Sequence, residues 1–327
     1  MTPLGEILRA LIRRAGPIRF SQFMELALYH PDYGYYRRGR DPFGRAGDYF
    51  TAEQIQPVYG LLIARIIRRR YQELGRPAEF TVVELGAGRA EMAEAFSAWS
   101  YVAVEAGGML PPRFTGVVFA NEFFDALPVE AVVRRAGRWR LLRVGCKDER
   151  FVWVEGEAVE GSLGGYLERY VPLEEEGARA EVPVEALRWL EKIASSLQQG
   201  FVLTVDYGYT PAECLRLPAG TLMSYRRHLA DPDVLADPGE RDITALVPFA
   251  ALAEHGAGCG LQLVRLERLG RVLLEAGEQD EFAGVLAAGT EAERRRRRLQ
   301  LKTILFDFGE SFRVLEQRRA TGPARDA

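Results

Sequence analysis

The chain has 327 residues, enough for about two domains, and its 47% hydrophobic and 27% charged residues are typical of a globular protein. This composition excludes a disordered chain, a collagen and a disulfide scaffold. The 43 basic and 46 acidic residues give a formal net charge of −3, which argues against a dedicated nucleic-acid binder.

Cysteine and histidine are both rare in the chain. The three cysteines lie far apart and only three histidines occur, so we expect neither a metal site nor structural disulfides. Residues 1–12 carry Glu6 and Arg9 among their apolar positions, unlike a secretory signal or a membrane anchor. We therefore expect a cytoplasmic protein that binds neither nucleic acid nor a membrane, and we leave open whether it forms an oligomer.

Helical periodicity dominates the first 75 residues. Apolar residues recur at helical spacing over 4–14, 20–29 and 51–71. We therefore expect residues 1–75 to form an N-terminal helical region that packs on the core of the protein.

Continuous apolar runs begin near residue 80 and alternate with helix-sized segments, a pattern typical of a parallel sheet that is buried on both faces. The fold class is therefore α/β, with a Rossmann-like domain over 76–128 and 184–327. We expect strands over 80–85, 101–105, 116–122, 201–206, 261–269 and 312–316, and helices over 90–99, over 184–197 and between about 278 and 306.

Residues 129–183 follow a different pattern. Two apolar runs, 129–134 and 139–144, lie on either side of Gly137 and predict a hairpin, and 151–155 predicts one more strand. We expect this segment to be an antiparallel β insertion in the α/β domain.

A tight glycine turn follows the first predicted strand. Glu84 ends that strand, and Gly86 and Gly88 allow the backbone to approach a ligand closely. The dinucleotide pattern G-x-G-x-x-G needs a third glycine at the position of Glu91, whose negative charge would oppose a phosphate at a helix N-terminus. The turn therefore favours a cofactor without phosphates.

Glu105 ends the next predicted strand, 21 positions after Glu84. An acidic side chain about 20 residues beyond such a turn can accept hydrogen bonds from both hydroxyls of a ribose. A glycine turn, a ribose acid and no phosphate-binding motif together favour S-adenosyl-L-methionine over a nicotinamide dinucleotide. The alternative is that both glutamates are only solvated strand ends.

The third predicted strand ends in Asn-Glu-Phe-Phe-Asp-Ala-Leu-Pro, residues 121–128. Carboxyl ends of parallel strands face the ligand crevice in open α/β sheets, so Asn121, Glu122 and Asp125 are candidate catalytic residues. The amide can accept a hydrogen bond from a substrate N–H, and the carboxylates can hold a cationic substrate. The alternative is that Asp125 caps the N-terminus of a helix.

The motifs Gly47 to Glu53, Glu84 to Gly88, 121–129, Asp206-Tyr207-Gly208, 220–228 and 237–245 resemble, in this order, the MidA / NDUFAF7 family of S-adenosylmethionine-dependent methyltransferases. The resemblance covers about residues 15–318. It implies a class I methyltransferase sheet with extra helical and antiparallel parts. It also implies cofactor contacts by Asp48, Thr51, Glu84, Gly86, Gly88, Glu105 and Asn121, and it places His228 near the substrate side as a candidate catalytic residue.

Two departures from the family pattern have structural consequences. Only 16 positions separate Glu105 from Asn121, and glycines and prolines among them disfavour a helix. We therefore expect this segment to run directly into the third strand, so that the sheet lacks one edge strand. The second departure is Ala90, where the family usually has a further glycine.

Arg294 to Arg298 form a run that covers every face of a helix, so some of these arginines must pair with acids or lie at an interface.

The family's mitochondrial members methylate an arginine of a respiratory complex I subunit. The resemblance therefore implies a protein substrate, a respiratory complex subunit being one candidate, and arginine as the modified residue. Two alternatives stay open: a methyltransferase that acts on a small molecule or another residue, and an assembly factor that binds a partner without turnover.

Overall fold

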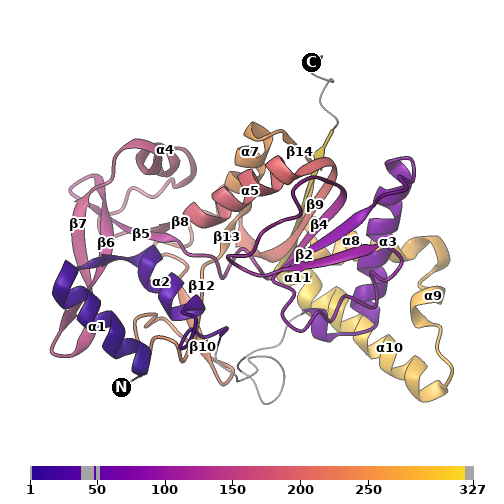
Figure 1. Cartoon of the computed structure of the whole chain (residues 1–327), viewed down its shortest axis with the longest axis horizontal. Coiled ribbons are helices and arrows are strands. Elements are labelled where there is room, and N and C mark those ends of the chain that lie inside the picture. Colours follow the sequence, from indigo (N-terminus) through magenta and orange to yellow (C-terminus); the bar gives the residue numbers. More distant parts are fainter. Residues whose placement is uncertain (1, 38–47, 49–51, 321–327) are drawn as a thin grey trace. The chain divides into compact units, whose positions relative to one another are not determined.

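The computed structural model describes residues 2–37, 48 and 52–320 of the chain, which form a mixed α/β structure (Figure 1). The described chain divides into two compact units. Unit 1 comprises Met1–Phe50, Asp125–Leu187 and Tyr209–Ala251, and unit 2 comprises Thr51–Phe124, Arg188–Gly208 and Leu252–Ala327. The patterns in the sequence do not indicate that residues 209–251 group with the N-terminal helices, because that grouping depends on long-range contacts.

Unit 2 is built on a mixed sheet of β2 (Thr81–Leu85), β3 (Ser100–Val104), β4 (Phe114–Asn121), β9 (Leu197–Tyr209), β14 (Leu261–Arg268) and β15 (Phe312–Arg319). The strands lie in the order β14-β15-β9-β4-β2-β3. The four strands β3, β2, β4 and β9 are parallel, whereas β15 runs antiparallel to both β9 and β14. All six predicted strands of this sheet are present, and the ends of β2 and β4 lie side by side.

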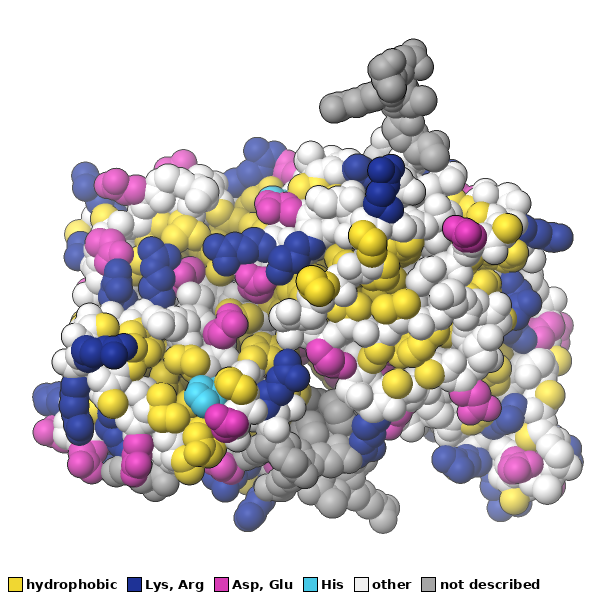
Figure 2. All heavy atoms as spheres, in the orientation of Figure 1, with side chains coloured by type: hydrophobic (Ala, Val, Ile, Leu, Met, Phe, Trp, Pro, Cys, Tyr) yellow, Lys and Arg dark blue, Asp and Glu magenta, His cyan; other side chains and the backbone are white. Residues whose placement is uncertain are grey.

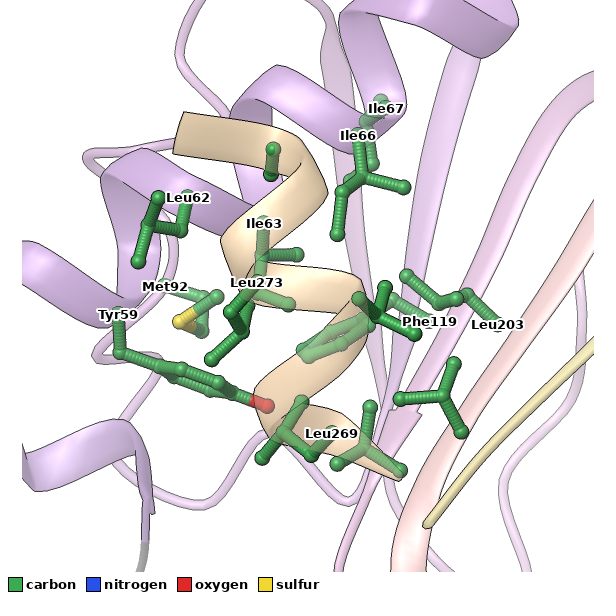
Figure 3. Close-up of a cluster of buried hydrophobic side chains, with 14 of the residues drawn as sticks. Tyr59, Leu62, Ile63, Ile66, Ile67, Met92, Phe119, Leu203, Leu269 and Leu273 are labelled. Carbon is green, nitrogen blue, oxygen red and sulfur yellow. The ribbon is translucent and has the colours of Figure 1, made fainter. Parts of the chain in front are cut away.

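The core of unit 2 forms where α3 (Val58–Glu73) and α8 (Leu269–Gly277) pack on this sheet. Figure 3 shows Ile63 of α3 and Leu273 of α8 beside Phe119 of β4, and all three side chains are fully buried. Each large apolar side chain that is buried in this way contributes roughly 1.5–3 kcal/mol. The helix predicted from residue 51 begins only at Val58, because Pro57 is not tolerated in a helix interior and stands at its N-cap.

The remaining helical elements include α5 (Val184–Ser196), α7 (Phe249–Gly258) and a C-terminal group. That group is η2 (Glu278–Asp280), α9 (Ala283–Leu286), α10 (Glu291–Thr303), η3 (Ile304–Phe308) and α11 (Gly309–Ser311), and the structure also contains η1 (Ala52–Gln54). The arginine run lies on α10, as predicted. Arg294 pairs with Glu291 at 3.0 Å, and Arg297 donates to the carbonyl oxygen of Val285 at 3.2 Å. The fold thus uses at least two of the five arginines internally.

The helix predicted over 90–99 is wrong. This segment is a series of turns in which hydrogen bonds join Ala90 N to Ala87 O, Ala93 N to Ala90 O and Trp99 N to Phe96 O. Ala90 has φ +54°, a left-handed conformation that stops a right-handed helix at its first turn. The apolar spacing reflects packing instead, since Met92 and Phe96 are buried in the core of unit 2.

The predicted absence of one edge strand is confirmed for the described residues. Gly107 to Arg113 contain neither helix nor strand, and the chain enters β4 directly at Phe114. β3 is therefore the last strand at this end of the sheet.

Unit 1 combines short helices with two antiparallel sheets. The first sheet has the order β1-β6-β5-β8 with β7 paired to β6, and the second has the order β11-β10-β12. Its elements are α1 (Pro3–Ala15), β1 (Ile18–Arg19), α2 (Phe20–Tyr29), β5 (Glu130–Arg135), β6 (Arg138–Lys147), β7 (Arg150–Ala158), α4 (Gly161–Tyr170), β8 (Arg179–Val182), α6 (Pro211–Cys214), β10 (Met223–Arg226), β11 (Leu229–Asp231), β12 (Asp242–Thr244) and β13 (Val247–Pro248). Pairing of Ile18 with Val144 joins the N-terminal segment to the β5–β6 hairpin.

The surface carries charges of both signs. On the face in Figure 2, Lys and Arg side chains are interspersed with Asp and Glu. Within the described ranges, no helix has the length and apolar character needed to cross a membrane.

Replacement of Ala90 by glycine should stabilise the protein. Glycine adopts positive φ without the steric cost that a Cβ imposes, so we expect Ala90→Gly to raise the free energy of unfolding by roughly 0.5–1 kcal/mol. Ala93→Gly is the matched control, because Ala93 is not among the positive-φ residues and glycine only adds chain entropy there. Denaturant unfolding should show a gain for the first variant and a loss for the second. A loss at Ala90 would contradict the strained turn.

Candidate cofactor site

The carboxyl ends of β2 and β4 bring acidic and amide side chains together in unit 2. Glu84 is the fourth residue of β2 and pairs in register with Phe119 of the neighbouring β4, which ends at Asn121. Glu122 follows directly. Three predicted site residues, Glu84, Asn121 and Glu122, therefore lie on adjacent strands at one edge of the sheet.

The glycine turn lies beside these residues. Gly86 has φ +68°, and a Cβ at this position would come within 2.8 Å of Cδ2 of Phe123. The N–H of Gly88 donates to Oε1 of Glu105 at 2.9 Å, although Glu105 is an exposed residue. The predicted ribose acid and the predicted glycine turn are thus in direct contact, and the Glu105 carboxylate faces the backbone that a cofactor would approach.

Glu84 is fully buried and has an unusual environment. Its Oε2 accepts a hydrogen bond from the Tyr101 hydroxyl at 2.5 Å, and it also bonds to Glu53 of η1. Burial raises the pKa of Glu84 to about 7, although the bonds from Tyr101 and Glu53 act in the opposite direction. Burial also raises the pKa of Glu53 well above its ordinary value, with repulsion from Glu84 and Glu122 adding to the effect.

Both polar atoms of the Asn121 side-chain amide form hydrogen bonds. Its Oδ1 accepts from the hydroxyl of Tyr59 at 2.6 Å, and its Nδ2 donates to Oε1 of Glu122 at 3.1 Å. Tyr59 is fully buried, and burial together with repulsion from Glu53 and Glu122 raises its pKa well above the ordinary value. Tyr59 therefore stays a hydrogen-bond donor that fixes the orientation of the amide.

Glu122 has a strained backbone with φ +50°. Its N–H donates to the carbonyl oxygen of Val205, and its Oε1 accepts from the N–H of Ala52 at 3.0 Å as well as from Asn121. A non-glycine residue in the left-handed region costs about 1 kcal/mol or more and is enriched at functional sites. The surrounding bonds fix both the backbone and the carboxylate of Glu122.

Asp206 holds the segment that follows Glu122. It is fully buried in β9, and its Oδ2 accepts from the N–H of Phe124 at 3.0 Å while Oδ1 accepts from the N–H of Tyr207 at 2.8 Å. Phe123 packs edge-on against Trp189, with ring centroids 5.2 Å apart. Together these contacts fix the Phe-Phe pair next to the glycine turn.

The other predicted site residues within the described chain belong to unit 1. Asp48 is buried and accepts hydrogen bonds from the hydroxyl of Tyr35 at 2.9 Å and from the N–H of Arg227 at 2.7 Å. The N–H of His228 donates to the carbonyl oxygen of Asp48 at 2.9 Å. Asp48 thus holds the turn between β10 and β11, where Arg227 and His228 have φ +51° and +63°. Its predicted cofactor contact and the catalytic role of His228 stay predictions.

Asp125 begins a turn and not a helix, so the alternative interpretation as a helix cap is wrong. Its carbonyl oxygen accepts from the N–H of Ala245 at 2.9 Å, and repulsion from its carboxylate adds to the burial that raises the pKa of Tyr225. The predicted cofactor residue Thr51 lies outside the described residues.

Sequence reasoning missed Glu53, Tyr59 and Tyr101. Glu53 is the last residue of the Gly47 to Glu53 motif, but the motif does not indicate its contact with Glu84. Tyr59 looked like one more apolar residue of a helix, and Tyr101 like the start of a strand. The hydroxyls of Tyr59 and Tyr101 form hydrogen bonds to Asn121 and Glu84, and these bonds form only because the fold places the residues side by side.

The chemistry of this edge suits a cationic organic ligand. Glu53, Glu84, Glu105 and Glu122 supply carboxylates, and the glycine turn supplies space near the backbone. Among the residues that the structure describes, no group of three or more His, Cys, Asp or Glu side chains could hold a metal ion.

The family model of S-adenosyl-L-methionine-dependent methyltransferases matches residues 94–266, more than half of the chain. The chain belongs to this family. The resemblance to the NDUFAF7-type methyltransferases is confirmed, and S-adenosyl-L-methionine is the cofactor that this membership supports.

Relatives and solved structures agree with this membership. The chain is 28% identical over 311 residues to the mitochondrial protein arginine methyltransferase NDUFAF7 homolog of Drosophila melanogaster, an alignment that covers 75% of this chain and 68% of the relative. It is 26% identical over 307 residues to mitochondrial NDUFAF7 of Danio rerio, covering 75% and 70%. A Burkholderia thailandensis protein crystallised with S-adenosyl-homocysteine has 29% identity and a TM-score of 0.86, covering 98% of this chain and 93% of that one.

The raised pKa of Glu84 predicts a pH-dependent stability. Because the folded state favours the protonated form, stability falls as the pH rises from about 4.5 to about 7. Glu84→Gln keeps the shape and removes the ionisation, so at pH 8 the variant should unfold at a temperature roughly 2–6 °C higher than the wild type. At pH 5 the difference should be much smaller. Differential scanning calorimetry at both pH values tests this, with Glu94→Gln at an exposed position as the control; an equal shift at both pH values would contradict it.

Proposed function

We propose that this protein transfers a methyl group from S-adenosyl-L-methionine to an arginine side chain of a protein substrate. The observation that carries the proposal is the Glu122 carboxylate, which is fixed by Ala52 and Asn121 at the carboxyl end of β4. The names of the relatives, which are protein arginine methyltransferases at 24–28% identity, support the same substrate. We also assign unit 2 to the Rossmann-like class I methyltransferase sheets, with the N-terminal helices and the antiparallel strands as additions.

The reaction is an in-line displacement. When bound, S-adenosyl-L-methionine would supply a methyl group whose bond to sulfur breaks with the electron pair staying on sulfur. The guanidinium nitrogen that forms the new bond to the methyl carbon would lose a proton to solvent. Alignment and electrostatics therefore supply most of the catalysis.

A guanidinium is charged at neutral pH and is a poor nucleophile. A fixed carboxylate can accept paired hydrogen bonds from it, orient its plane and draw its charge away from the attacking nitrogen. We assign this role to Glu122, with Asp125 as its partner. In this proposal Asn121 positions the Glu122 carboxylate through its amide, and His228 contributes to catalysis on the substrate side.

The cofactor part of the proposal assigns the adenosine ribose to Glu105. A charge-assisted hydrogen bond of this kind is worth about 1.5–3 kcal/mol, so Glu105→Ala should weaken S-adenosyl-L-methionine binding by that amount. Glu79→Ala, at an exposed position outside the turn, is the control and should bind like the wild type. Calorimetric titration measures both, and unchanged affinity of Glu105→Ala would remove Glu105 from the site.

If Glu122 acts on the guanidinium, its substitution should lower the maximal rate far more than the affinity for the cofactor. Glu122→Gln preserves shape and removes one negative charge, so maximal rate should fall roughly 10²-fold or more while cofactor affinity changes little. Asp125→Asn should behave similarly. The substrate is first identified by incubating radiolabelled cofactor with extract of cells that lack the protein. If Glu122→Gln labels that substrate at the wild-type rate, Glu122 does not act on the guanidinium.

A second candidate function is binding to an assembly partner without turnover. The left-handed backbone of Ala90 beside the glycine turn favours it, because strain there opposes a tight cofactor turn. A calorimetric titration that detects no binding of S-adenosyl-L-methionine would support this alternative. The Ala90→Gly variant should then bind S-adenosyl-L-methionine more tightly than the wild type.

The cytoplasmic location stays a prediction.

A further inference from the structure

One oxygen of a buried carboxylate in unit 2 lacks a hydrogen-bond donor. Glu84 is 0% exposed, and its Oε2 accepts from Tyr101, but its buried Oε1 has no donor among the described residues. A buried polar atom without a partner is costly, and a buried charge without a partner is more so. A proton or a positively charged ligand is therefore needed at Oε1.

Glu53 can supply the proton. It lies on η1, is 8% exposed, and forms a side-chain hydrogen bond with Glu84. An ionised carboxylate only accepts hydrogen bonds, so two carboxyl groups bond to each other only when one of them is protonated. A hydrogen bond between Glu53 and Glu84 therefore requires a proton between the two carboxyl groups. Burial, which raises the pKa of both groups, favours this state near neutral pH.

The groups that face this pair do not neutralise it. Within the described chain, no Lys, Arg or His forms an ion pair with either carboxyl group. The facing titratable groups are Tyr59 of α3, Tyr101 of β3, and three glutamates that follow strands: Glu91 after β2, Glu105 after β3 and Glu122 after β4. Asp206 of β9 acts on Tyr59. All of them are acidic or phenolic, so the pair lies in a region of negative charge that favours a cation.

An organic cation fits this region better than a metal ion does. No cluster of three or more metal-ligating side chains occurs in the described ranges, which include both glutamates. S-adenosyl-L-methionine carries two positive charges, the sulfonium and the ammonium, and both are absent from most other adenosine compounds. Glu84 lies two residues before Gly86 of the turn whose Gly88 contacts Glu105.

We propose that Glu53 and Glu84 together bind a positive charge of S-adenosyl-L-methionine and release their shared proton to solvent when the cofactor binds. The inference rests on the assignment of the cofactor to this edge of the sheet. One positive charge enters and one proton leaves, so the net charge of the site is unchanged by binding. Glu53, to which the sequence motifs assign no role, becomes a cofactor-binding residue.

Calorimetry in two buffers with different ionisation enthalpies measures the proton release directly. For the wild type, titration with S-adenosyl-L-methionine at pH 6.0–6.5 should release close to one proton, and the release should fall toward zero at pH 8.5. The Kd should fall about five- to tenfold between pH 6 and 7. S-adenosyl-homocysteine keeps the ammonium but lacks the sulfonium, so release with both ligands assigns the pair to the ammonium, and release with the first alone assigns it to the sulfonium.

Two variants separate this role from a structural one. In Glu53→Gln the amide donates permanently to Glu84, so binding should persist with little proton release. Tyr101→Phe keeps both carboxyl groups but removes a donor to Glu84, so the pH midpoint of release should move upward. Tight binding by the wild type with no buffer-dependent heat at pH 6.0–6.5, or equal release by Glu53→Gln, would overturn the proposal and leave the cofactor assignment intact. No binding of either ligand at any pH would overturn both.

Discussion

The burial of carboxyl groups at the carboxyl ends of β2 and β4 is the constraint on which the rest of unit 2 depends. Glu84 and Glu53 are buried among tyrosines and other acids, and no basic side chain of the described chain pairs with them. Removing such groups from water lowers stability unless protons, donors or a ligand satisfy them. The Tyr101 hydroxyl donates to Glu84 and the backbone N–H of Ala52 donates to Glu122, and these two bonds meet part of this need.

Several specific contacts hold the backbone at the same edge of the sheet. Gly86 leaves room for the ring of Phe123, and Asp206 fixes the backbone of Phe124. Glu122 retains a left-handed backbone because its N–H and its carboxylate are both bonded. A site that stores strain in this way is costly for folding, and binding energy from the cofactor and the substrate can offset that cost.

Local patterns predicted the elements whose burial is regular. The central strands β2, β4 and β9 are largely apolar runs because both faces of the sheet are covered there. Pro111, Pro112 and their neighbours correctly indicated a direct path into β4. Residues 90–99 have helical spacing but form turns, because the backbone of Ala90 takes a conformation that periodicity does not report.

Residues of the candidate site could be proposed from the sequence only where they lie next to a strand end. Glu84, Glu105, Asn121 and Glu122 could be picked out because each follows or ends an apolar run. The partners of these residues could not be, since Glu53 and Tyr59 reach Glu84 and Asn121 across 31 and 62 positions of the chain. Pairing over such distances depends on how α3 packs on the sheet. A local sequence pattern carries no information about that packing.

The most direct test of the account is a crystal structure of the protein with S-adenosyl-homocysteine bound. We predict ligand density at the carboxyl ends of β2, β3 and β4, with the ribose hydroxyls within hydrogen-bond distance of Glu105 and the backbone of Gly86 to Gly88 against the ligand. Density at another edge of the sheet, or a ribose that contacts neither Glu105 nor the glycine turn, would contradict it.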